Sequence, residues 1–297
     1  LYTLDKAIDL ERLRDALYKV IAAHPAFFSY YTTDDSGEPL IEERKDLPIV
    51  IEINEVENME AVKHDISKRF NLADSRPIHI ALYSGKDHNY MLFEVHHIIA
   101  DGASASVLMN EIDRAYNGED IEPEDYTFYD VTAEELRLRA GSEEYEAARL
   151  WYEQNFNIGD VDTQIIADRN EKEAAVVHAE YNLNIDKENI RHLIESTEVK
   201  AGTLFTSAFA LLMSKFTGDE QVLFSTIWHG RSDKRMARTM GMFVKTLPVH
   251  YAFHRGMTLA ELFAHGDKII KGARKHSVFS YSDANASLGI KSNYLFV

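Results

Sequence analysis

The sequence has no cysteine among its 297 residues. It therefore has no disulfide, no thiolate nucleophile and no cysteine-based metal site. It also lacks any apolar run of about eighteen residues, and no basic segment followed by an apolar core stands near its start. We therefore expect neither a membrane partner nor a signal peptide, and a cytoplasmic location by default.

Basic residues are scarce, because 32 Lys and Arg stand against 49 Asp and Glu, a formal net charge of −17. Nucleic-acid binding draws most of its affinity from clustered Lys and Arg, so we expect no nucleic-acid partner. Solubility is a sufficient explanation for the acidic balance. The length and the 45% hydrophobic content allow one large core or two modest ones, and the length favours about two domains.

Hydrophobic patterns and turn residues predict the secondary-structure elements. The expected helices are one capped by Asp9 that stops at His24-Pro25, 58–70, one starting at Ser104 or Ser106 and closed by Asn117-Gly118, 143–156, 187–197 and 203–216. The expected strands are 29–31, 40–43, 49–53, 78–83, 90–97, 176–183 and 221–228. Residues 119–130 are expected to be turn-like, and 157–175 form the best linker. His24 precedes a proline, so we interpret it as a helix-end histidine satisfied by backbone carbonyls.

One stretch, 89–104, concentrates residues capable of chemistry, because a strand leads through His96 and His97 into Asp101, Gly102 and a helix. Alternate residues of a strand share a face. One face would then carry Tyr90, Leu92, Glu94 and His96, and the other Met91, Phe93, Val95 and His97. The two histidines are expected to point in opposite directions, so they cannot easily hold one metal ion together with Asp101, and no metal site is predicted.

The pattern His-His-x-x-x-Asp-Gly at 96–102 resembles the active-site motif of condensation domains of nonribosomal peptide synthetases, which are chloramphenicol-acetyltransferase-like acyltransferases. Gly230-Arg231 and the segment 241–248 are similar to a second family pattern, Gly-Arg followed by Gly-x-Phe-x-Asn-Thr-Leu-Pro. Residues 9–29 are similar to the stretch that contains Arg-His-x-x-Leu-Arg-Thr. The chain departs from the family at Ala23 and Phe28, which replace two arginines, and at Lys245, which replaces an asparagine.

The resemblance covers essentially the whole chain and implies an α/β (α+β) fold. Two chloramphenicol-acetyltransferase-like halves, each a sheet flanked by helices, would meet at a substrate tunnel, with the fold truncated at both ends. We place the N-terminal half at 1–157, a linker at 158–175 and an incomplete C-terminal half at 176–297.

The resemblance also implies roles at the site. His97 would act as the general base, or would position the acceptor amine, and the Gly102 amide would face the developing oxyanion. His96 would be a buried structural histidine. Asp101 would turn away from the substrate and pair with Arg231, although a plain turn or cap role also explains an aspartate there.

By the same resemblance the chain would join a donor acyl or peptidyl thioester to the amine of an acceptor aminoacyl thioester. Both substrates would be carried on phosphopantetheine by donor and acceptor peptidyl carrier domains, with an adenylation domain in the same assembly line. The chain itself would bind no cofactor and no metal. Two alternatives remain open: a free-standing coenzyme A-dependent O- or N-acyltransferase of this fold, and a catalytically idle carrier-docking module. Epimerisation is disfavoured, because Ala103–Ser106 replaces an expected Trp-containing extension.

Overall fold

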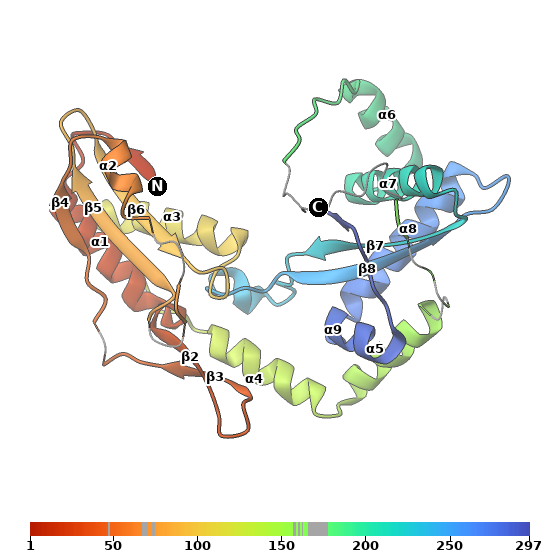
Figure 1. Cartoon of the computed structure of the whole chain (residues 1–297), viewed down its shortest axis with the longest axis horizontal. Helices are drawn as coiled ribbons and strands as arrows, with labels where there is room; N and C mark the ends of the chain where they lie inside the picture. The colour runs from red at the N-terminus through yellow and green to blue at the C-terminus, as the bar shows by residue number, and fades with distance from the viewer. Residues whose placement is uncertain are drawn as a thin grey trace, which may run out of the picture. The chain divides into compact units, whose positions relative to one another are not determined.

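The computed structural model describes residues 1–46, 48–66, 70–72, 75–156, 159, 161, 163–165 and 178–297. By contacts, the chain divides into two compact units (Figure 1). The first unit comprises Leu1–Glu135 and Arg231–Val244, and the second comprises Leu136–Gly230 and Lys245–Val297. Most of the predicted linker 158–175 lies outside the described residues, so the predicted boundary between halves stays a prediction.

The first unit is built on a four-stranded sheet in the order β1-β6-β5-β4. These strands are β1 (Tyr2–Leu4), β4 (Glu52–Glu55), β5 (Ile78–Ser84) and β6 (Asn89–Val95). β6 pairs antiparallel with both β1 and β5, whereas β4 and β5 are parallel. The expected strands 78–83 and 90–97 are confirmed as β5 and β6 and form a hairpin, with Ser84 opposite Asn89 across the turn, and the motif strand β6 is one of the two central strands.

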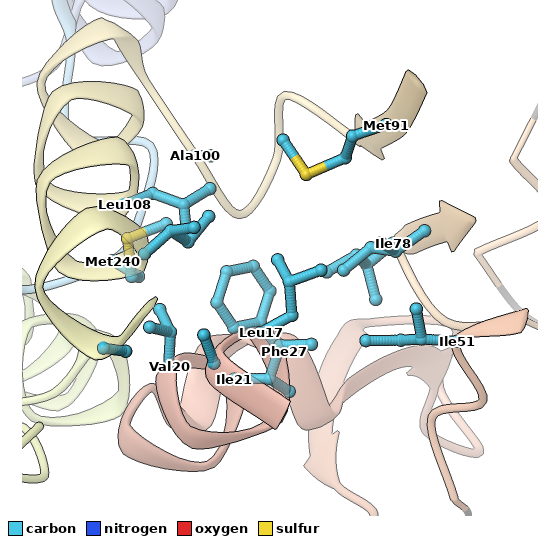
Figure 2. Close-up of a cluster of buried hydrophobic side chains, with 14 of the residues drawn as sticks. Leu17, Val20, Ile21, Phe27, Ile51, Ile78, Met91, Ala100, Leu108 and Met240 are labelled. Carbon is cyan, nitrogen blue, oxygen red and sulfur yellow. The ribbon is translucent and has the colours of Figure 1, made fainter. Parts of the chain in front are cut away.

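Helices cover both faces of this sheet because its side chains alternate. Ile80, Leu82 and Met91 join one core with α1 (Leu10–Ala23) and α3 (Gly102–Tyr116). The other face packs Ala81, Tyr83, Tyr90 and Leu92 against Val62 of α2 (Met59–Lys63). Figure 2 shows the first of these cores, in which Leu17 and Phe27 lie near Ile78 and in which Leu108 and Met240 lie close together.

Local sequence signals explain where the helices begin and end. Asp9 caps α1 by accepting hydrogen bonds from the amides of Glu11 and Arg12, and Pro25 starts the short 3-10 helix η1 (Pro25–Phe28). The expected strands 29–31 and 40–43 are also present, as β2 (Ser29–Thr33) and β3 (Pro39–Glu43), and they form an antiparallel hairpin.

The second unit has a three-stranded sheet in the order β8-β7-β9. β7 (Gln221–Trp228) pairs antiparallel with β8 (Lys245–Ala252) and parallel with β9 (Leu295–Phe296). Its helices are α5 (Glu143–Asn155), α6 (Lys187–Thr197), α7 (Ala201–Thr217), α8 (Leu259–Lys275) and α9 (Tyr281–Leu288). α7 and α8 lie side by side along the sheet of β7 and β8 (Figure 1). Each unit is thus a sheet flanked by helices, as expected.

The structure corrects several expected elements. α4 (Phe128–Arg139) was not predicted as a helix, and its first residues were expected to be turn-like. Its residues fall in both units. β4 begins three residues later than expected, and α2 ends at Lys63, with 67–69 outside the described residues. The described part of the predicted strand 176–183 pairs with no strand among the residues that the structure describes, so its alternating pattern forms no strand there.

No helix within the described ranges is long and apolar enough to cross a bilayer.

Candidate active site

The two histidines lie in a turn after β6, not on the strand itself. β6 ends at Val95, although the His96 amide still donates a hydrogen bond to the Pro77 carbonyl at 2.8 Å. The chain then turns, and the Ile99 amide donates to the His96 carbonyl at 3.1 Å. The expected alternation therefore stops before the histidines, and the strand argument does not determine where their rings point.

The ring of His96 is held by the turn that it opens. Its Nδ1 accepts a hydrogen bond from the Ile98 amide at 3.1 Å, so in the neutral ring the proton is on Nε2. The ring also meets the edge of Phe70, with centroids 5.9 Å apart. We expected this histidine to be buried, but it is half-buried, because it lies in a surface turn and not within the sheet.

His97 and Gly102 are both exposed on the first unit, His97 in the segment that joins β6 to α3 and Gly102 directly after that segment. Gly102 is the first residue of α3, where backbone amides have no partner within the helix. A Cβ placed on Gly102 would meet nothing within 4 Å, so the space above its backbone is open. The site thus offers an accessible imidazole in the segment that leads into a helix start, and the free amides of that start attract negative charge.

Asp101 points into the protein and starts α3. Its Oδ1 accepts from the Ser104 amide at 2.8 Å, which makes Asp101 the N-cap where we had expected Ser104 or Ser106. Its Oδ2 accepts from the Phe243 amide at 3.2 Å. Burial alone would raise the pKa of Asp101. The hydrogen bonds from the Ser104 amide and the Arg231 guanidinium lower the pKa by more than burial raises it, so it lies below its ordinary value.

The predicted ion pair between Asp101 and Arg231 is present, with Arg231 Nη2 2.9 Å from Asp101 Oδ1. Both side chains are almost fully enclosed, at 1% exposure for Asp101 and 9% for Arg231. Arg231 also donates from Nη1 to the carbonyls of Met236 and Thr239, at 2.7 and 2.8 Å, and stacks over the ring of Phe243. Arg231 therefore holds both the Asp101 carboxylate and its own segment, through the carbonyls of Met236 and Thr239.

Ser104 completes this group, and sequence reasoning missed its role. Its hydroxyl accepts from Arg231 Nη2 at 2.8 Å and lies 3.0 Å from both Asp101 Oδ1 and the Gly241 carbonyl, to one of which it donates. The Gly241 amide lies 3.3 Å from the same hydroxyl. Its position three residues after the cap was the available signal, since that residue's amide meets a capping side chain. We call Asp101, Ser104 and Arg231 the aspartate node.

A second buried cluster surrounds His24. Its Nδ1 lies 2.5 Å from Glu124 Oε1, and its Nε2 lies 2.6 Å from Glu111 Oε2. The ring is thus satisfied by carboxylates and not by the carbonyls that we expected, because α1 ends against α3 and the segment 121–126. Arg238 joins the cluster through its Nε, 2.8 Å from Glu111 Oε1. We call these four residues the histidine cluster.

No group of three or more His, Asp or Glu is placed to hold a metal ion in the part of the chain that the structure describes.

A family model described as "Condensation domain" matches residues 1–296. Among curated relatives, surfactin synthase subunit 1 of Bacillus subtilis (strain 168) is 23% identical over 304 residues, covering 99% of this chain and 8% of the relative. Tyrocidine synthase 3 of Brevibacillus parabrevis is 22% identical over 295 residues, covering 97% of this chain and 4% of the relative. The chain therefore spans less than a tenth of these two relatives.

Solved structures of low sequence identity share the fold. The X-domain from teicoplanin biosynthesis has a TM-score of 0.79 at 18% identity, covering 98% of this chain and 68% of that one. The first condensation domain of the calcium-dependent antibiotic synthetase, in complex with a substrate analogue, has a TM-score of 0.76 at 19% identity, covering 99% and 72%. An epimerization domain from tyrocidine synthetase B has a TM-score of 0.75 at 18% identity, covering 98% and 70%. Since the family model extends over nearly the whole sequence, the chain belongs to the condensation-domain family.

Proposed function

We propose that this chain forms an amide bond between a donor acyl or peptidyl thioester and the amine of an acceptor aminoacyl thioester. The observation that carries the proposal is the geometry of the family motif. His97 is exposed, Gly102 opens α3, and the Asp101 side chain between them turns inward to Arg231. The motif thus exposes a base and the backbone amides at the start of α3, whereas its carboxylate has a structural role.

The proposed chemistry uses these groups directly. An amine that attacks a thioester carbonyl loses a proton as the new bond forms, and a neutral His97 imidazole would accept it or hold the amine in place. The carbonyl oxygen gains negative charge in the tetrahedral intermediate, and the Gly102 amide at the start of α3 would stabilise it. Collapse of the intermediate expels the donor thiolate and leaves the amide.

The partners follow from the same proposal. The relatives of this chain include surfactin and tyrocidine synthases, of which it matches a small part. Donor and acceptor carrier domains would present their substrates on phosphopantetheine, and an adenylation domain would activate the amino acid. The chain would supply protein groups alone, with no cofactor of its own.

One observation favours a second candidate, a docking module without catalysis. Two X-domain structures match with TM-scores of 0.79 and 0.80, and one of them is described as a complex of the X-domain and OxyB. A domain of this fold can therefore serve as a binding partner for another protein. Ala23, Phe28 and Lys245, which depart from the family pattern, are consistent with that role.

The test is amide formation between aminoacyl groups loaded on a donor and an acceptor carrier domain, with the full-length protein and mass spectrometry of the product. We expect His97→Ala to lower the rate by roughly a hundredfold or more, the scale for a lost general base, without a change in melting temperature. His88→Ala is the matched control, because His88 is also exposed but lies in the turn of the β5–β6 hairpin. An undiminished rate in His97→Ala would refute the catalytic role of His97, whereas a wild-type protein that forms no amide would favour the docking module.

A further inference from the structure

We propose that His24 is a positioning residue for the proposed reaction, a buried imidazolium that holds the segment Arg231–Val244 against α3 and thereby keeps the aspartate node in place. The inference rests on the proposed function for its kinetic readout. Its structural part stands on the contacts of the first unit alone.

The geometry favours a charged ring. His24 is fully buried, and each of its nitrogens lies within 2.6 Å of a carboxylate oxygen. A neutral imidazole has one N–H, so its other nitrogen would present a lone pair to a carboxylate. Only the imidazolium donates to Glu111 and Glu124 at once. Burial would lower the pKa of His24, but its hydrogen bonds to the two glutamates raise it above the ordinary value, in agreement with the geometry.

The charges of the histidine cluster balance only with that proton. Glu111 of α3 and Glu124 of the segment 121–126 contribute two negative charges, and Arg238 and protonated His24 contribute two positive ones. A neutral His24 would leave one unbalanced negative charge in a buried site, which is strongly unfavourable. Glu111, Glu124 and Arg238 are the charged groups around His24 on the segments that pack against the end of α1.

The cluster holds the segment that supplies Arg231. Glu124 Oε1 also accepts from the Met240 amide at 2.6 Å, and Arg238 donates to the Glu122 carbonyl at 2.7 Å. The next amides along the chain serve the aspartate node, since Gly241 meets Ser104 and Phe243 meets Asp101. A shift at 238–240 would therefore reach the carboxylate that starts α3, one residue before Gly102.

The experiment substitutes His24→Gln in the full-length protein. Glutamine is neutral and offers its amide to one glutamate, so the other carboxylate loses its partner. We expect kcat for amide formation to fall between about tenfold and a hundredfold, the scale of a small misplacement of reacting groups, with KM nearly unchanged. Hydrogen exchange should become faster at the amides of 238–243, well below the melting temperature, while β5 and β6 keep their protection.

His79→Gln is the control, because it removes a half-exposed histidine–glutamate contact between β5 and β6. If His24→Gln fails to fold, Arg238→Met tests the same cluster from its more exposed end and should speed exchange at 238–243. Unchanged exchange at 238–243 in a folded variant, or a wild-type kcat, overturns the proposal. A wild-type protein that forms no amide contradicts the proposed function instead, and the exchange readout still decides the role of His24.

Discussion

Asp101 combines two roles that the sequence left as alternatives. It caps α3 through the Ser104 amide, and it pairs with Arg231, which lies 130 residues further along the chain. The cap is a local feature, but the ion pair is not visible in composition or periodicity. It was predicted only through the resemblance to a family, because a contact across such a separation leaves no local pattern.

We expect Asp101→Asn and Arg231→Met each to lower the free energy of unfolding by about 3–5 kcal/mol. Both groups are enclosed, and removing one partner leaves a buried charge without compensation. Asparagine is still a good helix cap, so the first variant isolates the lost charge. The double variant should recover part of the loss.

Urea unfolding of the four proteins gives the double-mutant cycle. Additive losses would show that the two side chains are energetically independent, contrary to the contact seen here. The contact of Ser104 with Gly241 and the contacts of the histidine cluster could not be predicted, because the partners lie up to 137 residues apart in the sequence.

At the level of elements, strong periodicity and turn chemistry located many of the helices and strands, but β8, α8 and α9 were not predicted. α1, α5, α6, β7 and the β5–β6 hairpin match their predicted spans to within about two residues, the usual uncertainty of an element boundary. α4 was missed because Val131 is its buried residue and the rest of the helix shows little apolar periodicity. The turn at His96 and His97 was not predicted, because the alternation of side chains does not show at which residue a strand ends.

Close packing of α8 on α5 makes a glycine necessary within a helix. A Cβ on Gly272 would collide with the indole of Trp151, which stacks on His276 with ring centroids 5.1 Å apart. We expect Gly272→Ala to destabilise the protein by about 1–3 kcal/mol, in spite of the better helix propensity of alanine.

Gly202→Ala provides the comparison in the first turn of α7, where a Cβ meets nothing within 4 Å. That change should be neutral or raise stability by up to about 1 kcal/mol. Equal melting temperatures for the two variants would mean that Trp151 moves aside without cost.

For the whole molecule, the buried charges set a pH range of greatest stability. The pKa of His24 is raised in the folded state, so its contribution is complete below the unfolded value of 6.5 and is lost as the pH rises through the folded value. The pKa values of Asp101 and Glu111 are lowered. Their contribution is complete above the unfolded values of 3.8 and 4.5 and is lost as the pH falls further.

Thermal melting across the range from acid to alkaline pH measures both limits. We expect the highest stability at pH values above the acid loss from Asp101 and Glu111 and below the alkaline loss from His24. In His24→Gln the stability should decline less at alkaline pH, since that variant has no proton to lose at this site. An alkaline decline of the same size in the variant would assign it to other groups.

The discontinuous first unit bears on how the protein is made. The carboxylate of Asp101 leaves the ribosome 130 residues before the guanidinium that neutralises it. At about 5–20 residues per second, that interval lasts on the order of ten seconds. During this time the acid at the start of α3 has no guanidinium partner, and the first unit cannot be completed until Val244 has emerged.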